Sequence, residues 1–228
     1  MSSKKEPNMF VFAGIICVVC SVLLTAAATG LKSLQDENVR IDKQKNILKA
    51  VGVLTDGQVV TKEKVASLYE TKIKNRWVTA AGKLLEASSS ESDRQVFLYE
   101  EGVSLVAYAV PVSGYGLWST IYGFLAIEGD GETVAGLTVY QHGETPGLGG
   151  ECEKPWFQNQ FVGKKIVDQD GKFVSVGIVK GKVADTVPEN KHQYYVDGMS
   201  GATITSKGME DFIKADLTYY EPFAKTLR

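Results

Sequence analysis

The feature that most constrains this chain is an apolar run close to its start, residues 9–30, which reads MFVFAGIICVVCSVLLTAAATG. The run contains no charged residue, and Lys4 and Lys5 precede it. Because an α-helix rises about 1.5 Å per residue, about 22 residues reach roughly 33 Å, enough to cross the hydrocarbon core of a bilayer. We therefore predict a membrane-spanning helix, preceded by a short tail at residues 1–8.

A cleaved signal peptide and a lipoprotein anchor are the alternatives to a retained helix. Ala26, Ala27 and Ala28 offer the small residues that a signal peptidase needs, but the run is longer than the usual apolar region of a signal peptide. Cys20 follows Val19, where a lipoprotein signal requires a small residue. Both observations favour a retained anchor.

The charges beside the run do not decide its orientation. Lys4 and Lys5 favour a cytoplasmic N-terminus, because positive charges near the ends of a span tend to stay in the cytoplasm. Long domains often cross regardless of charge, however, and cations also follow the run closely: Lys32, Arg40, Lys43 and Lys45.

Charge and cysteine content argue against several classes of protein. The formal net charge is −2 with both signs interspersed, so we expect no nucleic-acid partner. Cys17 and Cys20 lie in the apolar run and Cys152 lies outside it, which leaves no disulfide framework. With His142 and His192 as the only histidines, no zinc-site spacing occurs, and we expect no metal centre.

The pattern after the anchor predicts an α+β fold. Residues 32–50 are typical of a polar helix that continues the membrane helix, and residues 61–85 have helical character. Segments rich in β-branched and aromatic residues then predict strands, separated by Gly, Asp and Pro, at residues 96–98, 104–110, 120–127 and 133–140.

The C-terminal part completes this fold class. Residues 128–131, EGDG, are a hairpin signal, and we expect a short helix at residues 155–162 and a strand at residues 172–179. A closing helix should cover residues 209–220 and end before Pro222. Strands between flanking helices indicate an antiparallel sheet with helices beside it, and no GxGxxG supports a Rossmann site.

Two glycine-rich segments interrupt the strand region, and such loops on a rigid scaffold often hold binding groups. Residues 113–120, SGYGLWST, place Trp118 beside hydroxyls, which suits either a flat isoalloxazine ring or a tight turn with a core tryptophan. Residues 142–150, HGETPGLGG, cannot form regular structure. Their amides suit an anion or the polar edge of a heterocycle, or the loop serves shape alone.

A third segment, residues 197–206, DGMSGATITS, precedes the closing helix and has three interpretations. Small residues and hydroxyls there can cap the helix. Ser200 or Thr203 could be a hydrolase nucleophile, but the G-x-S-x-G pattern is absent and histidine is scarce. A threonine on a glycine-containing loop can also accept a flavin through a phosphoester, which a helix N-terminus would stabilise.

The motifs favour the flavin interpretation. Residues 197–203, DGMSGAT, resemble the D-x-x-[ST]-G-A-T acceptor motif of flavoproteins that carry FMN as a phosphoester on the last threonine. Residues 144–150, ETPGLGG, and residues 114–118, GYGLW, are similar to other FMN-domain motifs of that group. With the anchor included, the whole chain resembles the C subunit of the Na+-translocating NADH:quinone oxidoreductases.

The resemblance implies an FMN site and no catalytic residue in this chain. Thr203 would carry the covalent FMN, and an FAD-dependent flavin transferase would recognise the motif that begins at Asp197. Tyr115 and Cys152 depart from the family pattern, which has a basic and an aliphatic residue there. The remaining residues expected at the cofactor are Ser200, Gly201, Ala202, Thr205, Glu144, Thr145, Leu148, Gly149, Leu117, Trp118 and Ser119.

The resemblance also implies a role within a redox-driven sodium pump. This protein would relay electrons between redox centres, and other membrane and peripheral subunits would couple NADH oxidation and ubiquinone reduction to sodium export. The protein would lie in the bacterial inner membrane with its flavin domain on the periplasmic side. The expected divisions are residues 1–8 as a cytoplasmic tail, 9–30 as the span, 31–60 as stalk and connector, and 61–228 as a single FMN-binding domain.

Three alternatives stay open on the sequence, one of which is a structural anchor whose glycine-rich loops only shape the domain. The equivalent flavin subunit of the related Rnf complex shares the motifs but receives electrons from ferredoxin; the GLWSTIYG stretch and Gly149-Gly150-Glu151 favour the quinone oxidoreductase. An anchored hydrolase that uses Ser200 or Thr203 would carry no flavin at all.

Overall fold

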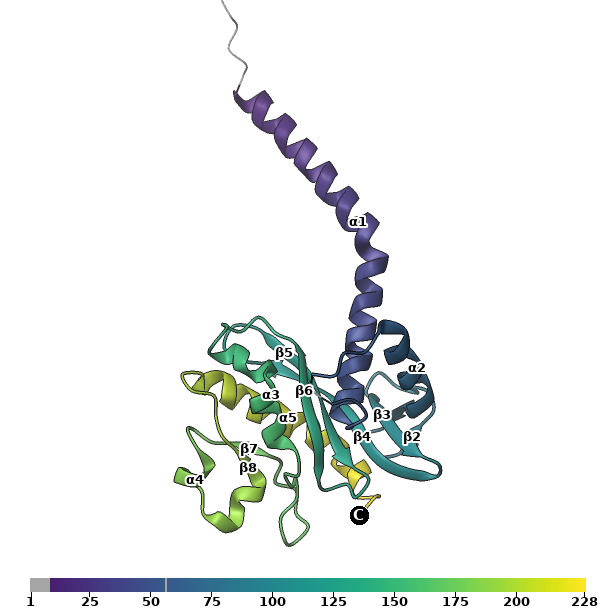
Figure 1. The fold of residues 1–228 in the computed structure, drawn as a ribbon, viewed down its shortest axis with the longest axis vertical. Helices are drawn as coiled ribbons and strands as arrows, with labels where there is room; N and C mark the ends of the chain where they lie inside the picture. Colours follow the sequence, from purple (N-terminus) through teal and green to yellow (C-terminus); the bar gives the residue numbers. More distant parts are fainter. Residues whose placement is uncertain (1–8, 56) are drawn as a thin grey trace, which may run out of the picture. The chain divides into compact units, whose positions relative to one another are not determined.

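The computed structural model describes residues 9–55 and 57–228, so the predicted tail at residues 1–8 lies outside the described residues. Helix α1, Met9–Ala50, is continuous (Figure 1). It is long and apolar enough to cross a membrane, with a mean hydropathy of 2.6 in its most apolar window. The predicted helix and its continuation are therefore confirmed, as a helix compatible with a single membrane anchor.

The chain divides into two compact units, one ending at Ile41 and the other running from Asp42 to Arg228. In the described residues of the second unit, six strands form an antiparallel sheet in the order β2-β1-β3-β4-β5-β6. The strands are β1 Ile73–Val78, β2 Leu84–Leu85, β3 Arg94–Glu101, β4 Ser104–Tyr115, β5 Thr120–Glu128 and β6 Val134–Gln141.

The run from β3 to β6 follows the predicted strand pattern closely. Sequential strands pair as neighbours because short turns join them. Between β5 and β6, Gly131 takes a positive φ of 69° and its N–H donates to the carbonyl of Glu128. The four strands and the hairpin are confirmed, and with them the α+β class with an antiparallel sheet and flanking helices.

Alternate side chains of each strand point to opposite sides of the sheet, and helices cover both faces. One face packs against α5, Thr203–Ala224, which crosses the sheet (Figure 1). The other face meets the last turns of α1, where the Thr138 hydroxyl donates to the carbonyl of Asn46. Helix α2, Lys62–Lys72, completes this second layer beside β1 and β3.

Helix α5 forms because its apolar residues recur at helical spacing. The buried positions Met209, Ile213 and Leu217 lie four residues apart and face the sheet. One turn further, the buried Tyr220 donates its hydroxyl to the carbonyl of Gln95 at 2.8 Å. The helix is thereby fixed to β3 as well as packed on the core.

Three expectations about element bounds are wrong. The helix expected at 61–85 ends at Lys72, because Ile73–Val78 pairs along its whole length with β3. The strand expected at 172–179 shrinks to β7, Gly177–Ile178, since Ser175 takes a positive φ of 67° that breaks an extended segment. The closing helix begins six residues before 209, and Pro222 lies inside its last turn.

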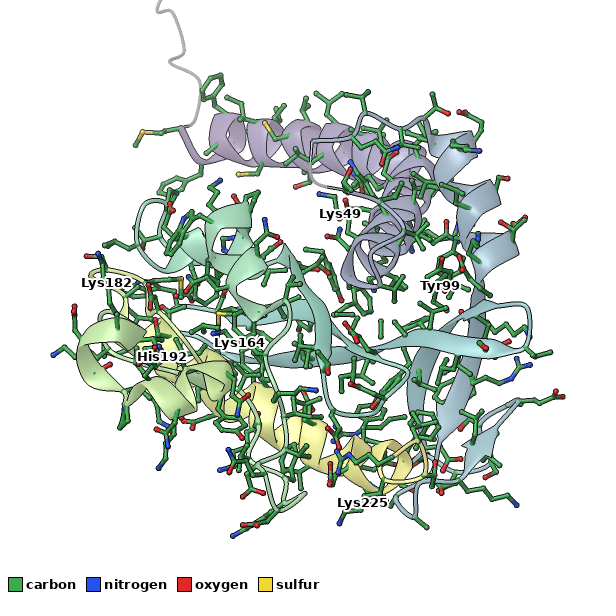
Figure 2. The ribbon with its side chains drawn as sticks, turned by 60° about the horizontal axis from the view of Figure 1, so that its bottom comes forward. Lys49, Tyr99, Lys164, Lys182, His192 and Lys225 are labelled. Carbon is green, nitrogen blue, oxygen red and sulfur yellow. The ribbon has the colours of Figure 1, made fainter. Side chains whose placement is uncertain are left out.

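Short elements between β6 and α5 cover one side of the domain. They are η1 Gly149–Glu153, α3 Pro155–Gln158, η2 Asn159–Phe161, α4 Val183–Thr186, η3 Glu189–Tyr194 and β8 Tyr195–Val196, which pairs in parallel with β7. The helical turns at 155–161 agree with the expected short helix. Lys164 donates to the carbonyl of His192 at 2.8 Å, which ties η3 to the preceding loop (Figure 2).

Leu217→Ala should lower the free energy of unfolding by about 2–5 kcal/mol, because a fully buried leucine leaves a cavity when truncated. Leu84→Ala, the same change at a residue 39 % exposed on β2, should cost less than about 1 kcal/mol. Denaturant unfolding of both variants measures the difference, and equal costs would mean that α5 does not pack on the sheet as described.

Candidate functional site

Glu144, in the second glycine-rich segment, is a buried carboxylate with 5 % of its surface exposed. Its Oε1 accepts hydrogen bonds from the backbone N–H groups of Trp118 at 2.8 Å and Ser119 at 3.1 Å. Its Oε2 accepts from the N–H of Leu117 at 3.2 Å and from the Thr205 hydroxyl at 2.6 Å. One side chain therefore joins all three glycine-rich segments that the sequence singled out.

The glycines let these segments approach one another closely. A Cβ on Gly149 would lie 2.6 Å from both Glu144 Oε2 and Thr205 Oγ1, and one on Gly116 would lie 2.8 Å from Glu144 Oε1. On α5, a Cβ at Gly208 would lie 2.2 Å from the carbonyl oxygen of Tyr115. The small residues are needed for packing around the carboxylate.

The environment of Glu144 favours its charged form. Burial alone would raise the pKa of the carboxyl, but the hydrogen bonds from Thr205 and from the Trp118, Leu117 and Ser119 amides outweigh that effect. The pKa of Glu144 is consequently lowered from its ordinary value. Above that ordinary pKa the ionised carboxylate stabilises the fold, and the contribution is lost as the pH falls through the lowered pKa.

The third segment leads directly into α5. Thr203 is the first residue of the helix and is exposed, while Ala202 before it is buried. Gly201 adopts a φ of +71°, and Ser200 is exposed. No side chain caps the helix at Ala202, so the capping interpretation of this segment is not observed.

The other hydroxyls of the segment are engaged in the interior. Thr205 is 1 % exposed and bonds to Glu144, and Ser206 is 4 % exposed and accepts from the N–H of Met199 at 3.2 Å. Of the threonine and serine side chains at 197–206, those of Ser200 and Thr203 are left facing solvent.

Asp197 lies at the end of β8 and organises the loop before α4. Its Oδ1 accepts a hydrogen bond from the N–H of Val183 at 2.7 Å, and its own N–H donates to Gln160 at 2.8 Å. The carboxylate therefore fixes the loop that carries Lys182 relative to the segment that carries Thr203.

A cleft of about 1080 Å³ opens beside Thr203. The acceptor segment forms one wall, and the loop between β7 and α4 forms another. The exposed Trp156 adds apolar surface to the cleft. Lys180 and Lys182 of the β7–α4 loop, and Lys207 of α5, add positive charge. The space lies just above the range that small-molecule sites usually occupy, roughly 300–1,000 Å³.

The start of α5 adds a feature suited to an anion. The N–H groups of the first helical turn lack partners within the helix, and the helix dipole places partial positive charge there. Thr203 projects its hydroxyl from this turn, and Lys207 follows one turn later on the same face. A phosphate group joined to Thr203 would therefore meet favourable charge.

The predicted site residues separate into two sets. Asp197, Ser200, Gly201 and Thr203 line the cleft. The others lie around the Glu144 carboxylate or beside it, with Leu117, Trp118, Thr145 and Leu148 exposed and Ser119, Glu144, Gly149, Ala202 and Thr205 wholly or partly buried.

Trp118 is not a core residue, since 69 % of its surface is exposed, so the tight-turn alternative with a buried tryptophan is wrong. Leu148 is linked to the acceptor segment, because a Cβ on Gly201 would lie 2.8 Å from its Cδ2. Leu148 therefore lies against the turn that precedes α5.

Sequence reasoning missed Trp156 and the lysines of the cleft. Trp156 follows Pro155, a residue typical of the first turn of a helix, and such an aromatic residue close to a glycine-rich loop was a usable signal. Lys207 stands four residues after Thr203, the helical spacing that places both on one face. Lys180 and Lys182 carried no such pattern.

Cys152 belongs to the core. It is fully buried, and burial raises the pKa of its thiol to about 12. The two histidines are also engaged, since His142 Nδ1 accepts from the N–H of Glu144 and His192 Nε2 lies 2.8 Å from the carbonyl of Val187. Neither imidazole bonds to Ser200 or Thr203, so a hydrolase that uses either hydroxyl gains no support.

Comparison with known proteins gives concordant matches. The family model described as FMN-binding domain matches residues 116–218. A Yersinia pestis protein, named as the C subunit of Na(+)-translocating NADH-quinone reductase, is 36 % identical, with 94 % of this chain and 90 % of that protein covered. A Pseudomonas aeruginosa protein of the same name is also 36 % identical, over 93 % of this chain and 91 % of the relative.

A solved structure agrees with both. The crystal structure of the C subunit of Na(+)-translocating NADH-quinone reductase from Parabacteroides distasonis superposes with a TM-score of 0.72 at 32 % identity, covering 85 % of this chain and 96 % of that one. These matches confirm the resemblance that the three motifs indicated, and the structural neighbour shares the α+β fold.

Glu144→Gln should lower the free energy of unfolding by about 1.5–3 kcal/mol at neutral pH, because hydrogen bonds to a charged acceptor are lost. The deficit should shrink as the pH falls through the lowered pKa of Glu144, since the protonated carboxyl then resembles glutamine. Urea unfolding of both proteins across this pH range measures it. Glu70→Gln, at an exposed position on α2, is the control, and a deficit independent of pH would contradict the assigned charge.

Proposed function

The chain belongs to the family of C subunits of the Na+-translocating NADH-quinone reductases, and we propose that it carries FMN as a phosphoester on Thr203 and relays electrons within that complex. As such it is a subunit of a translocase with an FMN-binding domain. Family membership also decides against the flavin subunit of the Rnf complex, the alternative that shares the motifs.

The single observation that carries the proposal is the placement of Thr203. Its hydroxyl is exposed on the first turn of α5 and opens on the cleft, whereas the neighbouring Thr205 and Ser206 are buried and hydrogen-bonded. A transferase can reach the first hydroxyl and not the other two. Both hydroxyls of the DGMSGAT motif, on Ser200 and Thr203, are thus accessible, and the proposed acceptor is the one at the motif's last position.

The residues of the cleft fit FMN. The α5 N-terminus would stabilise the phosphodiester, and Lys180 and Lys182 supply positive charge, while the Lys207 amine is already paired with Glu210 and Asp211. Trp156 offers an apolar surface on which a flat ring can lie. When bound, FMN supplies one-electron chemistry.

The chain's own residues would hold and orient the cofactor. Glu144 keeps the segments at 114–119 and 142–150 in place, so that Leu148 stays beside the acceptor turn and Trp118 stays fixed at its backbone. Thr145 and Gly149 belong to the same loop and are proposed to shape its flavin side. Covalent attachment suits a relay, because the cofactor then cannot dissociate between electron transfers.

The proposed partners are the other membrane and peripheral subunits, with an FAD-dependent flavin transferase acting during maturation. We propose that residues 9–30 span the bacterial inner membrane, 31–60 form the stalk and connector, and 61–228 form the flavin domain on the periplasmic side. The apolar part of α1 supports a single span. One such helix cannot line an ion path, so sodium export, driven by electrons that pass from NADH to ubiquinone, is assigned to partner subunits.

Thr203→Ala should abolish covalent flavin while the thermal midpoint changes little, because the residue is exposed. In-gel flavin fluorescence after expression with the transferase measures attachment. Thr205→Ala should give the reverse pattern: flavin is retained, and the free energy of unfolding falls by about 1–3 kcal/mol through loss of the bond to Glu144. Full fluorescence in Thr203→Ala would sink the assignment.

Asp197→Asn separates recognition of Asp197 by the transferase from its structural hydrogen bond to the Val183 N–H. The asparagine Oδ1 can still accept the Val183 N–H, so the thermal midpoint should stay close to that of the native protein. Loss of the carboxylate should nevertheless reduce flavin attachment at least tenfold, if the transferase needs its charge. Asp197→Ala, which removes the acceptor as well, should lose both stability and flavin. Normal flavinylation of Asp197→Asn would make Asp197 a structural residue alone.

A further inference from the structure

A second cavity lies away from the flavin cleft. It measures about 300 Å³, a volume at the lower end of the range for small-molecule sites, and lies among the loop before β7, the end of η3 and α5. The residues of its lining that matter here are Ser175, Lys191, Tyr195 and Lys214. None of them belongs to the three glycine-rich segments.

Ser175 is the unusual residue of this cavity. It is 3 % exposed, and its hydroxyl has no hydrogen-bond partner among the described residues. It also takes a φ of +67°, a conformation rare for residues other than glycine. A buried hydroxyl without a partner costs about 1–3 kcal/mol, and a ligand at this cavity wall would supply the missing hydrogen bond.

The charges around the cavity favour an anion. No hydrogen bond or ion pair to another described residue engages the amine of Lys191 or Lys214. The two carboxylates of the lining are already used. Asp168 accepts from the N–H groups of its own turn, and Glu210 accepts from the N–H of Ile178 at 3.2 Å and from Lys207 at 3.1 Å.

The cavity also has an aromatic wall. The ring of Tyr195 lies directly on Gly177, where a Cβ would come within 2.5 Å of it, and this contact fixes the ring at the cavity. A small apolar body can pack against such a surface. Two free amines and a hydroxyl match the charge and the three acceptor oxygens of a phosphate group better than the two oxygens of a carboxylate.

We propose that this cavity binds a small phosphate-bearing molecule, with its phosphate received by the Ser175 hydroxyl and the amines of Lys191 and Lys214. The site is separate from the acceptor cleft, although the two share neighbouring turns of α5: Ser206 and Lys207 line the cleft, and Glu210 and Lys214 line the cavity. The ligand would not be covalently attached.

Calorimetric titration of the full chain in phosphate-free detergent buffer tests this proposal, with inorganic phosphate and phenyl phosphate as probes. At least one probe should bind, and Lys214→Met should weaken it about tenfold, as expected for loss of one charge-assisted hydrogen bond. Tighter binding of phenyl phosphate would assign an organic phosphate, and equal or tighter binding of inorganic phosphate would assign the free ion. Lys64→Met, on the exposed face of α2, is the control and should change nothing.

Ser175→Ala tests the same site without changing a lysine. Without ligand its thermal midpoint should equal or exceed that of the native protein, because an unpartnered hydroxyl is removed. Its affinity for the probe should still fall severalfold. The proposal is overturned if neither probe binds, or if binding is weakened by Lys182→Met in the acceptor cleft and not by Lys214→Met. A lowered midpoint of ligand-free Ser175→Ala would also overturn it, since the hydroxyl would then have a partner within the protein.

Discussion

The buried carboxylate of Glu144 sets the constraint on which the rest of the site depends. A charge in the interior must be satisfied by hydrogen bonds, and here three amides of one loop and a hydroxyl of α5 supply them. The donors come from two distant parts of the chain, and the farther one, Thr205, is 61 residues from Glu144. Because the carboxylate needs all of them, the loops after β4 and β6 are held to the start of α5.

This arrangement also determines which hydroxyls remain available. Thr205 is used by Glu144, and Ser206 is used by the backbone of its own loop. Thr203, two residues before Thr205 on the helix, points away from that contact and towards the cleft. The same interaction that stabilises the fold therefore keeps Thr205 out of reach of an external transferase, while Thr203 and Ser200 stay exposed.

Much of the fold followed from local pattern. The strands from β3 to β6 are rich in β-branched residues and separated by turn residues, so type and order were predictable. Ile73–Val78 was mistaken for helix because its strand character comes from pairing with β3, a contact between distant residues. The expected strand at 172–179 is interrupted at Ser175, which takes a positive φ. A serine in a sequence gives no sign of such a backbone conformation.

The candidate site was predictable as a set of motifs but not as a geometry. The sequence grouped Glu144 and Thr205 in the flavin-binding set but did not predict that they bond to each other in the interior. Trp156, Lys180 and Lys182 come from segments without a motif, and the tertiary fold brings them to the cleft beside Thr203.

Tandem mass spectrometry of the flavinylated chain tests the central claim most directly. Tryptic cleavage after Lys191 and Lys207 yields one peptide that contains Ser200, Thr203, Thr205 and Ser206. The account predicts the FMN phosphoester on every fragment that contains Thr203, and on none that ends at Ala202 or begins at Ile204. A flavin on Ser200, Thr205 or Ser206, or a peptide with no flavin, would contradict it.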